Sequence, residues 1–231
     1  MLTLKITATL AALAALTAAA LPAAAQTSPF TVFGTGVDAN GAVLANGTLG
    51  DPHYTVSTSA PGGSSQIQVL TSAYGFPIVK GGWVGDSSTS AWIAPTNDPF
   101  LNGGQDFGGY YDYQTTFDLT GYDPATASLS GNWAADDSAT LLINGVATGQ
   151  NTPNGYSSYS TFDIGSGFQP GINTLDFVVL EDGSGATGLR VDGITGSAAA
   201  VPEASSTVSL GLLLALGVGG VLVARRKTAK A

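Results

Sequence analysis

The strongest constraint in this sequence is a run of strand-length segments between residues 115 and 143, in which apolar and polar side chains alternate. Phe117 and Leu119 alternate with polar neighbours, and Leu129 and Trp133 share one face of a later segment. A period of two residues is typical of a strand with one buried face. Because Gly, Asn or Asp residues separate the segments, the pattern predicts the central hairpins of a β-sandwich.

Two further segments extend this pattern. Asn144-Gly145, in which both residues tolerate positive φ, predicts a tight type I′ hairpin. Leu175, Phe177 and Val179 alternate with their neighbours in another strand. We expect this strand to lie opposite Trp133 across the core between the sheets.

The composition agrees with an all-β fold made of short strands and many turns. The 231 residues include 32 Gly and 11 Pro, whereas charged residues make up only 10%. We therefore predict a single antiparallel β-sandwich of the jelly-roll type, over about residues 28–198 and with eight to ten strands. The chain has no cysteine, which excludes disulfides and thiolate metal sites, so this domain depends on its apolar core.

The first 25 residues have the three parts of a secretory signal peptide. Lys5 supplies the positive charge, residues 6–21 form a short apolar run that favours a helix, and Ala23-Ala24-Ala25 provides small residues for cleavage. We expect cleavage after Ala25, so that the domain occupies residues 26–200.

The last 31 residues, 201–231, form a separate region. Residues 208–224 are uncharged and apolar, and Arg225-Arg226-Lys227 follows directly. A run of this length predicts a short transmembrane helix, and the basic cluster predicts a cytoplasmic C-terminus with the domain on the other side.

The charge of the domain is strongly acidic. Between residues 26 and 200, Lys80 and Arg190 are the only basic residues against 15 Asp and Glu, so the net charge is −13. Such a surface argues against nucleic-acid binding, which depends on basic contacts to phosphate. Either solubility outside the cell or the binding of a divalent cation would explain it.

The sequence requires no cofactor, and calcium is the candidate that the acidic loops offer, because hard cations take carboxylate and carbonyl oxygens as ligands. The candidate ligands follow predicted strands, and turns between strands collect at the ends of a sandwich; they are Asp136, Asp137, Glu181 and Asp182. Turn capping by carboxylates is the explanation that we favour, and calcium binding is the alternative.

Aromatic side chains in or beside loops are the candidates for sugar binding, since aromatic faces stack on sugar C–H groups. The ligand-binding candidates, including the only histidine, are His53, Trp83, Trp92, Tyr110, Tyr111, Tyr156 and Tyr159. For Trp92 we favour a position in the core or as a loop anchor, and His53 is expected to hydrogen-bond a loop or to line a ligand surface.

The sequence offers little for catalysis. One histidine cannot complete a typical imidazole metal site, there is no Gly-x-Ser-x-Gly turn, and Glu181 is the only glutamate of the domain. Asp136 and Asp137 are adjacent and would point to opposite faces of an extended strand. We expect no catalytic residues; if the protein is an enzyme, a hydrolase is the type to test.

The C-terminal region resembles the PEP-CTERM sorting signal of Gram-negative bacteria. The resemblance rests on Val201-Pro202-Glu203, the glycine-rich apolar run and Arg225-Arg226-Lys227; the usual second proline is Ala204 here. It implies export through the inner membrane and a transient membrane anchor. It also implies processing by an exosortase near Pro202-Glu203, followed by release or display at the cell surface.

The mature region resembles secreted PEP-CTERM proteins with a jelly-roll domain of the galactose-binding or carbohydrate-binding-module type. The stretches that carry this resemblance are GVDANGAVLANGTLGDPHYTV, SAWIAP, TTFDLTGYDPATASLSGNWAADD, LLING, PGINTLDFVV and TGLRVDGITGSA. The first hypothesis is therefore a non-enzymatic surface or biofilm-matrix protein that binds extracellular polysaccharide. A structural matrix or adhesion protein without a sugar site is the alternative, and an extracellular hydrolase is the third.

Overall fold

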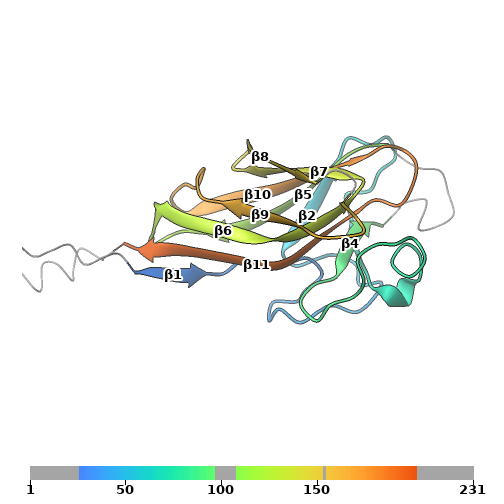
Figure 1. Cartoon of the computed structure of the whole chain (residues 1–231), viewed down its shortest axis with the longest axis horizontal. Coiled ribbons are helices and arrows are strands. Elements are labelled where there is room, and N and C mark those ends of the chain that lie inside the picture. The colour runs from blue at the N-terminus through green and yellow to red at the C-terminus, as the bar shows by residue number, and fades with distance from the viewer. Residues whose placement is uncertain (1–25, 97–107, 153–154, 202–231) are drawn as a thin grey trace, which may run out of the picture.

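Two antiparallel β-sheets face each other across a shared apolar layer (Figure 1). The structure, a computed structural model, describes residues 26–96, 108–152 and 155–201. One sheet has the order β3-β4-β11-β6-β9, with β1 also paired to β11, and the other has the order β2-β5-β10-β7-β8. The strands are β1 (Thr27–Phe30), β2 (Tyr54–Thr58), β3 (Ile67–Leu70), β4 (Trp92–Pro95), β5 (Gly109–Asp118), β6 (Tyr122–Asp136), β7 (Ser138–Ile143), β8 (Val146–Thr152), β9 (Ser160–Ile164), β10 (Ile172–Glu181) and β11 (Gly188–Ala200); a short 3₁₀ helix, η1 (Ser72–Tyr74), follows β3.

The strand order is that of a jelly roll. From β4 to β11 the chain crosses to the other sheet at every connection except the β7–β8 hairpin. If these eight strands are numbered in sequence, the sheets read 1-8-3-6 and 2-7-4-5, which is the jelly-roll arrangement. The predicted fold is confirmed, although β1, β2 and β3 bring the described strands to eleven instead of eight to ten.

The central segments are strands, but they are not consecutive hairpins. β5 and β6 lie in different sheets, and so do β6 and β7, so the prediction that residues 115–143 form hairpins is wrong. The alternation of side chains reveals a buried face but not the partner strand, which explains the error. The hairpin at Asn144-Gly145 is confirmed, with φ of 51° and 75°.

Trp133 lies at the centre of the layer between the sheets. Its side chain is fully buried on β6, and its ring centroid is 5.5 Å from that of Phe177 on β10 and 6.5 Å from that of Phe162 on β9. Leu175 and Val179 of β10 are buried in the same cluster. The predicted position of Trp133 opposite this strand is therefore confirmed.

A second apolar layer covers the other face of the β3-β4-β11-β6-β9 sheet near β4. On β4, Ile93 points into the main core, whereas Trp92 and Ala94 point to the opposite face. There they join Trp83 and Ile78 from residues 71–90, which we call the 71–90 segment. One end of the sandwich thus has three layers instead of two.

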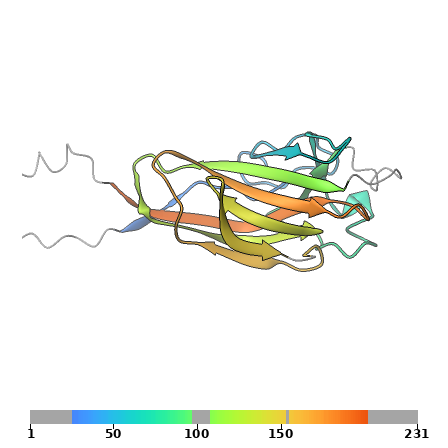
Figure 2. The same cartoon turned by 90° about the horizontal axis from the view of Figure 1, so that it is seen from above.

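The two ends of the described chain lie together, at the opposite end of the sandwich from the link between β10 and β11 (Figures 1 and 2). β1 pairs with the last residues of β11, with Thr27 opposite Ala199. Between residues 26 and 201, the described parts contain no helix with the length and apolarity needed to cross a membrane. The predicted signal helix (1–25) and transmembrane helix (208–224) lie outside the described residues.

We expect Trp133→Ala to lower the free energy of unfolding by about 3–5 kcal/mol, because it removes a fully buried indole from a closely packed aromatic cluster. The shift of the denaturation midpoint at constant slope measures this loss. Val146→Ala, at a residue with 67% exposure, is the control and should leave the midpoint nearly unchanged. Equal midpoints for both variants would contradict the central role of Trp133.

Candidate functional site

An open cleft lies at the three-layered end of the sandwich, where β6 and β10 end and β11 begins. Asp136, the last residue of β6, pairs with Gly188 at the start of β11, and Leu180 of β10 pairs with Ser138 of β7. Because β6 and β10 end at the same edge of the molecule, the acidic pairs 136–137 and 181–182 come together, as the sequence predicted.

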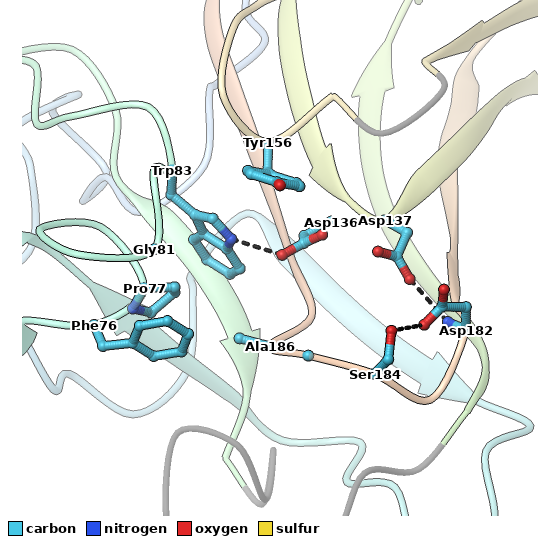
Figure 3. A pocket seen from close by; sticks show the side chains of 11 residues that line it. Phe76, Pro77, Gly81, Trp83, Asp136, Asp137, Tyr156, Asp182, Ser184 and Ala186 are labelled. Carbon is cyan, nitrogen blue, oxygen red and sulfur yellow. Dashed lines mark hydrogen bonds between the residues drawn. The ribbon is translucent and has the colours of Figure 1, made fainter.

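The cleft has a volume of about 360 Å³ and two chemically different walls (Figure 3). We define the aromatic wall as Phe76, Trp83 and Tyr156, and the acidic wall as Asp137, Asp182 and Ser184; Figure 3 shows them on opposite sides. The full lining is Phe76, Pro77, Gly81, Trp83, Asp136, Asp137, Tyr156, Asp182, Ser184, Gly185 and Ala186.

Trp83 connects the aromatic wall to β6. Its Nε1 donates a 2.7 Å hydrogen bond to Oδ2 of Asp136, and its ring lies 4.1 Å from the ring of Trp92. Trp83 is only 4% exposed, whereas Phe76 is 39% exposed and Tyr156 is half-buried. Phe76 and Tyr156 therefore offer the accessible aromatic surface, and Trp83 forms the base beneath them.

Arg190 of β11 holds the 71–90 segment in place. Its guanidinium is fully buried and donates hydrogen bonds to the carbonyls of Val84, Gly85 and Ser90 and to the hydroxyl of Ser90, at 2.5–3.2 Å. Burial lowers the pKa of Arg190 from its ordinary value. The carbonyl of Val84 also accepts from Nε1 of Trp92. This network fixes the chain that follows Trp83, and hence the aromatic wall.

The acidic wall is organised by hydrogen bonds within the loop after β10 and between this loop and Asp137. Oδ2 of Asp137 accepts from the backbone N–H of Asp182 at 2.9 Å, and Ser184 donates its hydroxyl proton to Oδ1 of Asp182. Beside them, Oε1 of Glu181 accepts from the N–H groups of Gly183 and Ser184. These bonds orient the carboxylates of the loop toward one another.

Three of the four predicted calcium ligands converge. Carboxylate oxygens of Asp137, Glu181 and Asp182 lie within 4.8 Å of one another, a spacing that can hold a divalent cation. Asp136 does not belong to this group, because its carboxylate accepts from Trp83 instead. Calcium binding stays a prediction, and melting curves in millimolar calcium and in chelator test it.

The other predicted ligand residues do not line the cleft. Trp92 and Tyr111 are buried, with exposures of 0% and 1%, so neither offers a face for stacking; Trp92 is a core residue, the alternative that its sequence context left open. Tyr159 is half-buried, with its ring centroid 5.8 Å from the guanidinium carbon of Arg190. His53 stacks on Phe33, and its Nε2 lies 3.0 Å from the carbonyl of Asp38.

The functional residues predicted from the sequence did not include Phe76, Ser184 or Arg190. Phe76 lies between a glycine and a proline, which is the only local signal of an irregular segment with an exposed aromatic residue. Arg190 is one of two basic residues in an acidic domain, and that isolation could have indicated a structural role. The predicted processing residues Ala25, Pro202 and Glu203 lie outside the described residues.

Comparison with known proteins yields structures that are similar only at a distance. No protein-family model and no curated protein matches the sequence. The carbohydrate-binding module TmCBM61, in complex with β-1,4-galactotriose, has a TM-score of 0.36 and 8% identity over 62% of this chain and 86% of that chain. The family 11 carbohydrate-binding module from Clostridium thermocellum has a TM-score of 0.30 and 15% identity over 75% of this chain and 100% of that chain. A Stig cyclase from Fischerella sp. TAU has a TM-score of 0.42 and 8% identity over 77% of this chain and 100% of that chain. At these values the likenesses do not place the chain in any of these families.

Tyr110, the remaining predicted aromatic residue, lies outside the cleft on the outer face of the β2-β5-β10-β7-β8 sheet. It is 54% exposed and pairs with Leu180 of β10.

Two carboxylates lie further along this outer face of the sheet. Gln114 donates a 2.6 Å hydrogen bond to the buried carboxylate of Asp176. Oδ1 of half-buried Asp112 is enclosed and has no hydrogen-bond partner among the described residues. Burial, and then the charge of Asp176, raises the pKa of Asp112.

We expect Asp112→Asn to stabilise the protein at neutral pH. A raised pKa means that the ionised carboxylate is less stable in the folded chain than in the unfolded chain, and the amide removes that charge. The gain should shrink as the pH falls through the raised pKa, because the wild-type carboxyl then becomes neutral. Melting temperatures of both forms across the acidic and neutral range measure this; a gain that does not change with pH would contradict the electrostatic explanation.

Proposed function

We propose that this protein is a non-enzymatic carbohydrate-binding protein whose sugar site is the cleft. The observation that supports this most directly is the aromatic wall facing the acidic wall across an open space. Aromatic faces stack on the C–H groups of a sugar ring, and carboxylates accept hydrogen bonds from its hydroxyls. A volume of about 360 Å³ is within the range of small-ligand sites.

The arrangement of the carboxylates favours binding over hydrolysis. Glycoside hydrolysis needs two carboxylates on either side of the scissile bond. Asp137 and Asp182 instead lie on the same wall, where Asp137 accepts from the backbone of Asp182. Asp136, nearer the aromatic wall, accepts from the indole of Trp83. A sugar between the two walls would meet carboxylates that bind and orient it.

We further propose that the protein is exported and presented at the cell surface or in an extracellular matrix. The basic and apolar residues before Ala25 and the apolar run 208–224 with its basic end support this proposal. β11 has 13 residues and extends from the cleft to the C-terminal end of the sandwich, a length of roughly 40 Å. A tether after residue 201 would therefore hold the cleft away from the anchoring surface.

Binding of the full chain to a glycan array tests the carbohydrate site. We expect Tyr156→Ala and Phe76→Ala each to weaken binding by about tenfold, the loss expected for one stacked aromatic ring. Tyr110→Ala removes a more exposed aromatic residue outside the cleft and should leave binding unchanged. If Tyr110→Ala alone abolishes binding, the site is on the sheet face; if no glycan binds, a structural matrix protein is the remaining explanation.

N-terminal sequencing of the mature protein tests the proposed export. The signal-peptide features predict a first residue of Gln26. A mature chain that still contains Lys5 would contradict this proposal without affecting the carbohydrate site.

A further inference from the structure

The groups that line the cleft accept hydrogen bonds more than they donate them. The carboxylates of Asp136, Asp137 and Asp182 are acceptors only when ionised. Two of the side-chain donors are already engaged, because Trp83 donates to Asp136 and Ser184 donates to Asp182, which leaves the hydroxyl of Tyr156. A ligand that fits this lining must bring donors.

Basic groups do not offset these carboxylates inside the cleft. The described lining residues include no Lys, Arg or His. Arg190 is buried, and its guanidinium is directed to the carbonyls that follow Trp83. Lys80 is exposed and is not part of the lining. Since the domain as a whole has a net charge of −13, the field in the cleft disfavours anionic sugars and favours cations.

The aromatic wall adds a second attraction for positive charge that does not depend on the acidic residues. Cations are attracted to the faces of Trp, Tyr and Phe, and aromatic residues beside carboxylates recognise ammonium groups in this way. Phe76 and Tyr156 offer such surfaces on the side opposite Asp137 and Asp182. A group between the walls would contact aromatic carbon on one side and carboxylate oxygen on the other.

We infer that the sugar unit bound in the cleft carries a positive charge, as in an amino sugar with a free ammonium group. This inference rests on the proposed carbohydrate-binding function and names the ligand class for the same site. An ammonium group donates three hydrogen bonds and accepts none, which matches a lining of acceptors. A hydroxyl brings one donor together with acceptor lone pairs, and N-acetyl and carboxylate groups bring further acceptors that find few donors there.

Calorimetric titration of the full chain with two trisaccharides tests the inference. One is a trimer of β-1,4-linked glucosamine, and the other is its N-acetylated form, which has the same backbone but no charge. In physiological salt with a chelator, we expect the free amine form to bind at least about tenfold more tightly, the lower end of what close charge pairs contribute.

Matched variants separate the cleft from the general acidity of the protein. Asp182→Asn and Asp137→Asn should each weaken binding of the glucosamine trimer by about tenfold. Asp163→Asn is the control, because it makes the same change of charge on an exposed residue of β9 outside the cleft lining. It should change the affinity less than about twofold, since salt screens distant charges.

The possible results distinguish the inference from the proposed function. If both trimers bind equally and Tyr156→Ala removes that binding, the carbohydrate site stands but the inferred positive charge of the ligand is wrong. The same conclusion follows if neutral glycans bind and the glucosamine trimer does not. Equal losses in Asp163→Asn and Asp182→Asn indicate diffuse attraction and overturn the inference. Binding that requires added calcium assigns the carboxylates to a metal and also overturns it. A chain that binds no glycan overturns both.

Discussion

The position of the cleft depends on the packing of β6 against β10 across the core. Trp133 and Phe177 meet with their ring centroids 5.5 Å apart, and this contact holds the two strands against each other in the core. Three residues after Trp133 the chain reaches Asp136, and four residues after Phe177 it reaches Glu181. Because a shift of one residue would turn every side chain to the other face, the apolar core also determines where the carboxylates emerge.

A second constraint builds the opposite side of the cleft. The 71–90 segment could not form an aromatic wall by its own local structure, since a short 3₁₀ helix is its only regular element. It is held instead by the apolar contacts of Trp83 and Trp92 and by the buried guanidinium of Arg190. A buried cation is costly unless hydrogen bonds satisfy it, and the carbonyls of this segment supply them. The cation and the segment therefore stabilise each other.

The two constraints place the cleft away from the ends of the described chain. The cleft lies at one end, and β1 and the last residues of β11 lie together at the other. Its aromatic side comes from a covering layer, whereas its acidic side comes from residues that end or follow core strands. In the proposed function, a ligand would lie between a surface that favours stacking and a surface that accepts hydrogen bonds. That combination suits a ring with donor groups better than a flat apolar molecule.

The sequence by itself determined the local features: the alternating strands, the Asn144-Gly145 turn, the burial of Trp133 and the meeting of two acidic pairs at one end. Each follows from residues close together in the chain, or from the general geometry of sandwiches. Only the tertiary structure decided which strands pair, that Trp92 is buried, and that Asp136 belongs with Trp83 instead of with Asp137. These outcomes depend on contacts between distant residues: Trp83 and Asp136 are 53 positions apart, and Arg190 and Ser90 are 100 apart. A period of two residues shows that a strand has a buried face, but it does not specify what covers that face, because the covering side chains come from elsewhere in the chain.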